Sequence, residues 1–143
     1  MTEDRLDKSG SLLSAIGQEG ATIVGGNPDG LYIYAETEDG SVFGAVFRNE
    51  GDVVRYYDPS LVMFDLIGDL WDLDDEDKQW LVMEYEINGT KFDVHFTFPD
   101  EVDPEDYATD RRRVALKKRY GDKPVIYPPM PDSFRGGSSK PPS

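Results

Sequence analysis

The sequence predicts an α+β fold, a single domain in which helices pack on an antiparallel sheet of about five strands. Two pairs of alternating segments flank the dipeptides Asp39-Gly40 and Asn88-Gly89, which are typical of β-hairpin turns. Segments with helical spacing of apolar residues precede, separate and follow these strands. The order is therefore helix, three strands, helix, two strands, helix. A length of 143 residues and a hydrophobic fraction of 38% suit one domain with its own core.

The first half of the chain is predicted to form a helix and a three-stranded meander. Residues 4–17 place their apolar side chains on one side of a helix, although Gly10 weakens its middle. Strands are expected at residues 31–37, 41–48 and 52–57, because short apolar and aromatic runs there are separated by turns that contain glycine.

A second helix is predicted to begin at Asp58-Pro59, where a carboxylate that can cap free N–H groups precedes a proline at the first helical position. The apolar residues that follow recur at helical spacing and are expected to be buried. They are Met63, Phe64, Ile67, Leu70 and Trp71. The helix then runs into an acidic loop that ends at Asp77.

The second hairpin is predicted to pair residues 80–87 with residues 91–98. One face of this hairpin is apolar, since alternate residues share a face: Leu81, Met83, Tyr85 and Ile87 on the first strand, and Phe92, Val94, Phe96 and Phe98 on the second. The opposite face is polar and is expected to meet solvent or a partner; it carries Glu84, Glu86, Lys91, Asp93 and His95.

A third helix is predicted from Asp103-Pro104 to Tyr120, with Gly121 at its end. Its basic residues lie toward its C-terminus, where they complement the helix dipole. The chain then becomes rich in Pro, Gly and Ser. The sequence thus divides into a domain at residues 1–122 and an irregular tail at residues 123–143.

The net charge of −14 is concentrated in residues 1–100, which hold 6 Lys/Arg and 22 Asp/Glu. Such a body repels nucleic acid and anionic membranes and attracts basic partners. The absence of cysteine excludes disulfides and thiolate metal sites. No apolar run is long enough to span a membrane, and no secretory signal is visible, so a cytoplasmic protein is expected.

No catalytic, metal or cofactor site is predicted. His95 is the single histidine, and alternation places it on the outer face of a strand. The acidic run from Asp72 to Asp77 differs from a calcium-binding EF-hand loop, since Asp77 and Met83 stand where that loop needs its glycine and its bidentate glutamate. With 29 acidic residues in the chain, catalytic carboxylate pairs cannot be inferred from the sequence.

The stretch WLVMEYEINGTKFDVHFTF at residues 80–98, followed by Asp103-Pro104 and an Arg-rich helix ending in Arg119-Tyr120-Gly121, resembles the YezG-like immunity proteins. The earlier strand at residues 31–37 is also similar, so the resemblance covers about residues 29–121. It implies an antitoxin that binds a secreted or contact-delivered bacterial toxin domain, often a nuclease, and blocks its active site.

The net charge independently favours a basic partner such as a nuclease cleft. The contact surface is predicted on the end of the second helix and its loop, at Asp65, Asp69, Asp72, Asp74, Asp75, Glu76 and Asp77, and next on Glu84, Glu86 and Asp93. Trp80 is either an aromatic anchor for the partner or a core residue. The alternative functions are a generic acidic adaptor or secretion chaperone and, third, a carboxylate- or metal-dependent enzyme.

Overall fold

The computed structural model describes residues 2–38, 41–75, 78–102 and 108–127. Three α-helices and a six-stranded, mostly antiparallel sheet form an α+β domain, which confirms the predicted fold class. The elements are α1 (Thr2–Ile23), β1 (Leu31–Glu38), β2 (Ser41–Asn49), β3 (Val54–Tyr57), α2 (Leu61–Trp71), β4 (Val82–Asn88), β5 (Lys91–Thr97), the 3-10 helix η2 (Pro99–Glu101), α3 (Ala108–Tyr120) and β6 (Val125–Ile126). No helix of the described residues is long and apolar enough to cross a membrane.

The strand order across the sheet is β5-β4-β1-β2-β3-β6. All neighbouring strands are antiparallel except β3 and β6, which pair in parallel with Val54 opposite Val125. The predicted irregular tail is therefore wrong at Val125 and Ile126, which form a short strand. The rest of the tail, residues 128–143, lies outside the described residues.

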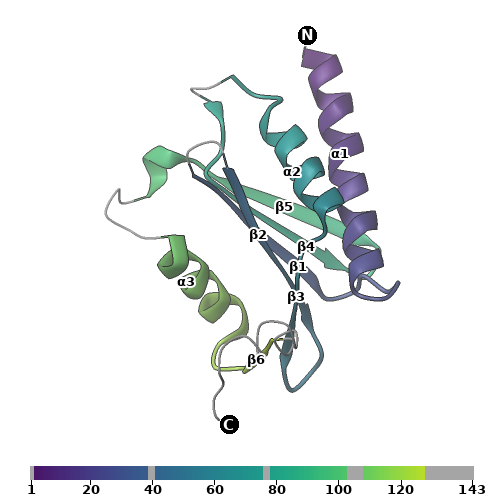
Figure 1. Ribbon diagram of the computed structural model, residues 1–143, viewed down its shortest axis with the longest axis vertical. Helices are drawn as coiled ribbons and strands as arrows, with labels where there is room; N and C mark the ends of the chain where they lie inside the picture. The colour runs from purple at the N-terminus through teal and green to yellow at the C-terminus, as the bar shows by residue number, and fades with distance from the viewer. Residues whose placement is uncertain (1, 39–40, 76–77, 103–107, 128–143) are drawn as a thin grey trace, which may run out of the picture.

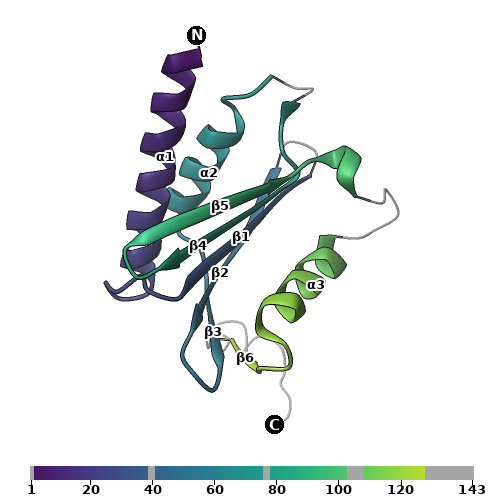
Figure 2. The same cartoon turned by 180° about the vertical axis from the view of Figure 1, so that it is seen from behind.

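The sheet is covered on both faces, with α1 and α2 on one face and α3 on the other (Figures 1 and 2). Alternate residues of β1 therefore enter two different cores, and every residue from Leu31 to Thr37 is buried. Leu31, Ile33 and Ala35 pack toward α1 and α2. Tyr32 and Tyr34 pack toward α3 with Phe47 and Val54.

Helix α1 runs without interruption from Thr2 to Ile23, longer than the predicted helix at 4–17. Packing against the sheet overrides the weak helix propensity of its glycines. A Cβ at Gly17 would lie 2.5 Å from the hydroxyl oxygen of Tyr85, and that hydroxyl donates a hydrogen bond to the carbonyl of Leu13 at 2.8 Å. Glycine at this position thus allows α1 to approach β4 closely.

Helix α2 begins two residues later than predicted, because Ser60 rather than Asp58 caps it. The Ser60 hydroxyl oxygen accepts a hydrogen bond from the Met63 N–H at 3.1 Å and donates one to Glu19 of α1 at 2.6 Å. Met63, Ile67 and Leu70 are buried as predicted, whereas Phe64 and Trp71 of the same stripe are only partly buried.

The predicted hairpin is present as β4 and β5, with Tyr85 opposite Val94; Asn88 pairs with Lys91, so the two loop residues are Gly89 and Thr90 rather than Asn88 and Gly89. Its apolar face packs toward α1 and α2, where Tyr85 stacks on Phe92 with ring centroids 5.2 Å apart. Trp80, just before β4, is 2% exposed and packs on Phe96. Of the two interpretations of Trp80, core packing is therefore correct and the partner anchor is wrong.

Candidate binding surfaces

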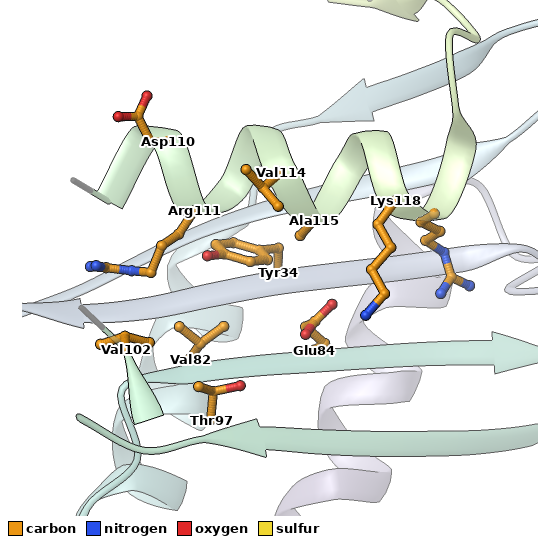
Figure 3. A pocket seen from close by; sticks show the side chains of 11 residues that line it. Tyr34, Val82, Glu84, Thr97, Val102, Asp110, Arg111, Val114, Ala115 and Lys118 are labelled. Atoms are coloured by element: carbon orange, nitrogen blue, oxygen red, sulfur yellow. The ribbon is translucent and has the colours of Figure 1, made fainter. Parts of the chain in front are cut away.

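An open groove of about 510 Å³ separates α3 from the outer face of the sheet (Figure 3). Its lining comes from β1, β4, the end of β5, the residue after η2, and α3. The lining residues are Tyr34, Val82, Glu84, Thr97, Val102, Asp110, Arg111, Val114, Ala115, Lys118 and Arg119. Glu84, Lys118 and Arg119 also line an adjoining hollow beside Asp93 and His95. Of the polar face of the second hairpin, Glu84 thus lines this groove, whereas Lys91, Asp93 and His95 are exposed, as expected for a face that meets solvent or a partner.

Two ion pairs hold α3 over the sheet. Arg111, near the start of α3, pairs with Glu36 of β1, and Arg119, near its end, pairs with Glu86 of β4. The Arg119 guanidinium also lies over the ring of Tyr32, 4.4 Å from its centroid. Lys118 extends from α3 toward the sheet beside Glu84 (Figure 3). The basic residues of α3 thus neutralise acidic residues of the sheet.

Two buried tyrosines complete the polar network on this face. The Tyr34 hydroxyl donates a hydrogen bond to Glu36 at 2.8 Å, and the Tyr32 hydroxyl donates one to Glu84 at 2.6 Å. Burial, followed by these hydrogen bonds to carboxylates, raises the pKa of both tyrosines above the usual value. Both hydroxyls therefore stay protonated at neutral pH and fix the carboxylates as acceptors.

The acidic surface predicted on the second helix is present on the opposite side of the sheet. We define it as Asp65, Asp69, Asp72 and Asp75, all of which are exposed. Asp65, Asp69 and Asp72 follow one another at helical spacing and so share one side of α2. Within the described residues none of the four makes an ion pair.

The remaining predicted residues fall into three groups. Asp74 is partly buried and has an interaction partner, so it lies at the margin of the acidic surface. Glu76 and Asp77 lie outside the described residues. Glu84, Glu86 and Asp93 lie together on β4 and β5 but on the other face of the sheet, so the two predicted acidic sets do not form one surface.

Sequence reasoning missed the ion pair of Glu36 with Arg111. Glu36 is 3% exposed, and it is a carboxylate within a run of apolar and aromatic residues. Such a buried charge requires a cation and hydrogen-bond donors. From the sequence, this requirement indicates that Glu36 has a basic partner; the structure identifies that partner as Arg111 of α3.

Within the residues that the structure describes, no group of three or more His, Cys, Asp or Glu side chains is arranged to hold a metal ion. His95 is exposed, and Glu84 is its cross-strand neighbour. Compared with models of protein families and with curated proteins, the chain gives no match.

Proposed function

We propose that this protein is an immunity protein (antitoxin) that binds a cognate bacterial toxin domain and covers its basic active-site cleft with the acidic surface of α2. A nuclease is the expected toxin class, because an enzyme that holds a phosphodiester backbone presents basic residues to it. The resemblance of the second hairpin and last helix to the YezG-like immunity proteins supports this proposal, as does the net charge of −14.

The observation that carries the proposal is the separation of charge between the two faces of the sheet. Among the residues whose side chains the structure describes, helices α1 and α2 carry Asp7, Glu19, Asp65 and Asp69 against Lys8. Helix α3 carries Arg111, Arg112, Arg113, Lys117, Lys118 and Arg119 against only Asp110. The basic residues thus lie across the sheet from the acidic surface, which keeps a negative potential available to a basic partner.

The acidic surface suits rapid capture of such a partner. Exposed charges of one sign accelerate association with a complementary surface, and the effect weakens as salt screens it. Fast capture is what protection from a toxin in the same cell requires. Asp69 and Asp72 also line a shallow hollow between α1 and α2 with Asp7, Lys8 and Leu12, in which three carboxylates and one ammonium group lie beside apolar side chains.

The proposal is tested by capture and inhibition. The tagged protein is used to capture binding partners from its native host, and the product of the neighbouring gene is purified and assayed for nuclease activity with and without it. Inhibition that is complete at equimolar protein is the expected result. Capture of a protein whose activity is unchanged in the complex would instead indicate an adaptor or a secretion chaperone.

The position of the surface is tested with two double variants that change the net charge equally. Asp69→Asn/Asp72→Asn is expected to lower the association rate constant about tenfold and to flatten its salt dependence. The control, Asp52→Asn/Asp100→Asn, neutralises exposed carboxylates elsewhere and is expected to have a smaller effect. Equal rates for the two variants would exclude the acidic surface as the contact site. Stopped-flow binding at several salt concentrations provides the measurement.

A further inference from the structure

The two edges of the sheet differ in how open they are. One edge ends in β6, which has two residues, whereas the other is β5, which runs from Lys91 to Thr97 without proline or glycine. Figure 2 shows β5 in front of the other strands, with no described element over it. A long edge strand with unpaired backbone groups is a template for another strand, and natural proteins usually blunt such edges.

The backbone groups that face this open edge belong to alternate residues of β5. The Ile87 carbonyl accepts a hydrogen bond from the Gly30 N–H, on the β1 side of β4, and Ile87 is opposite Phe92. In an antiparallel ladder, pairs whose backbone groups hydrogen-bond to each other alternate with pairs whose backbone groups point away from each other. Because the backbone of Ile87 points to β1, Ile87 and Phe92 form a pair of the second kind, and the N–H and C=O groups of Phe92 point away from β4. By the same alternation Val94 and Phe96 also point theirs at the open edge.

We propose that two copies of this chain pair through β5, antiparallel and centred on Val94, to form one continuous sheet. In this register Asp93 lies opposite His95 of the second copy, and Phe92 lies opposite Phe96 of the second copy. The backbone groups that face the edge then pair with one another. A shift of the centre to Asp93 or His95 would place two aspartates or two histidines opposite each other. The register centred on Val94 avoids these like pairs, because each Asp93 carboxylate then faces an imidazole, whose ring N–H can donate a hydrogen bond to it.

The side chains of β5 suit this partner. Phe92 is 42% exposed, although its ring stacks on Tyr85, and Phe96 packs on Trp80 of the same chain. Pairing extends these contacts into a row of aromatic rings across the interface. Lys91 and Asp93 leave β5 with no net charge when His95 is neutral, which limits repulsion between two chains that each carry −14. The inference does not depend on the proposed function.

The mass of the full chain in solution tests the proposal. Sedimentation velocity over a concentration series is expected to show a concentration-dependent species of twice the 16.1 kDa monomer mass. Val94→Pro removes an N–H that faces the open edge without removing a β4 hydrogen bond, and it is expected to abolish this species. A monomer at every concentration would overturn the proposal, and so would a dimer that persists in Val94→Pro.

A charge exchange distinguishes loss of pairing from loss of folding. Asp93→His places a histidine opposite His95 of the second copy, and His95→Asp places an aspartate opposite Asp93 of the second copy. Each single change is therefore expected to weaken association about tenfold. The double variant Asp93→His/His95→Asp restores opposite partners and is expected to restore the dimer. Asp52→His, exposed and distant in sequence from β5, is the matched control. A double variant that dimerises no better than the single variants would refute this register.

Discussion

The docking of α3 depends on the ion pair of Arg111 with Glu36, and Arg111→Met tests this dependence. The Glu36 carboxylate has a donor on each oxygen: Oε1 accepts from Tyr34 at 2.8 Å and Oε2 accepts from Arg111 Nε at 2.9 Å. Methionine preserves the apolar stem of the arginine side chain but removes the donors to Oε2. The variant therefore leaves a buried carboxylate with half of its hydrogen bonding and without its cation.

The size of the effect follows from the burial of the pair. Removing one partner of a buried ion pair costs about 3 to 5 kcal/mol of unfolding free energy, because the other charge stays buried. The side chains of Arg111 and Glu36 are 18% and 4% exposed, so partial solvation of the arginine places the expected loss near the lower end, at about 3 kcal/mol. Arg113 is the matched control. It pairs with Asp110, but its side chain is 75% exposed, so Arg113→Met is expected to cost about 0 to 1 kcal/mol.

Urea unfolding at neutral pH, followed by tryptophan fluorescence, measures both losses. Hydrogen exchange of the α3 amides shows whether that helix becomes the least protected one in Arg111→Met. Glu36→Gln/Arg111→Met removes the stranded charge and is expected to recover at least half of the loss. A loss below about 1 kcal/mol in Arg111→Met, or one equal to that of Arg113→Met, would refute the claim that this pair anchors α3.

Two further predictions concern the contact of α1 with Tyr85. Gly17→Ala is expected to lower the free energy of unfolding by about 1 to 3 kcal/mol, because its Cβ would lie 2.5 Å from the Tyr85 hydroxyl oxygen. Gly10→Ala, in open space on the same helix, is expected to raise it by about 0.5 to 1 kcal/mol. Urea unfolding measures both, and equal effects of the two alanines would contradict the close approach. Burial raises the pKa of Tyr85 to about 12, so its stabilising effect is complete below pH 10 and is lost as the pH rises toward 12. The stability advantage of the native protein over Tyr85→Phe is therefore expected to shrink by up to about 2 to 3 kcal/mol above pH 10, and a difference that stays constant with pH would contradict this cause.

The local elements could be predicted from the sequence because their causes are local. The pairing of β4 with β5 and the face that each side chain takes follow from the glycine turn near Asn88-Gly89 and from the alternation of apolar side chains on either side of it. The buried stripe of α2 follows from helical spacing, since Met63, Ile67 and Leu70 fall on one side. In both segments the residues at the ends of the element and the spacing of its apolar residues indicate the same secondary structure.

The position of α3 could not be predicted in this way. Arg111 lies 75 residues after Glu36, and their pairing depends on which face of the sheet the last helix covers. The helix itself shows no strong apolar side; Val114 is 65% exposed, and Ala115 and Leu116 are only partly buried. Periodicity therefore gives no orientation for it. For the same reason the alternation in β4 and β5 predicts a polar face that meets solvent or a partner, but it does not predict that Arg119 of α3 pairs with Glu86 on that face.

This cover also explains why the two predicted acidic sets differ in what they offer a partner. On the groove side, Glu86 is paired with Arg119 and Glu84 is held by Tyr32, so that within the described residues Asp93 is the one member of this set that is exposed and outside any ion pair. A basic partner would have to displace these contacts, at a cost close to what it gains. On the α2 side, Asp65, Asp69, Asp72 and Asp75 are exposed and, within the described residues, free of ion pairs. Their charge is available without rearrangement, which favours the α2 side as the first contact with the proposed basic partner.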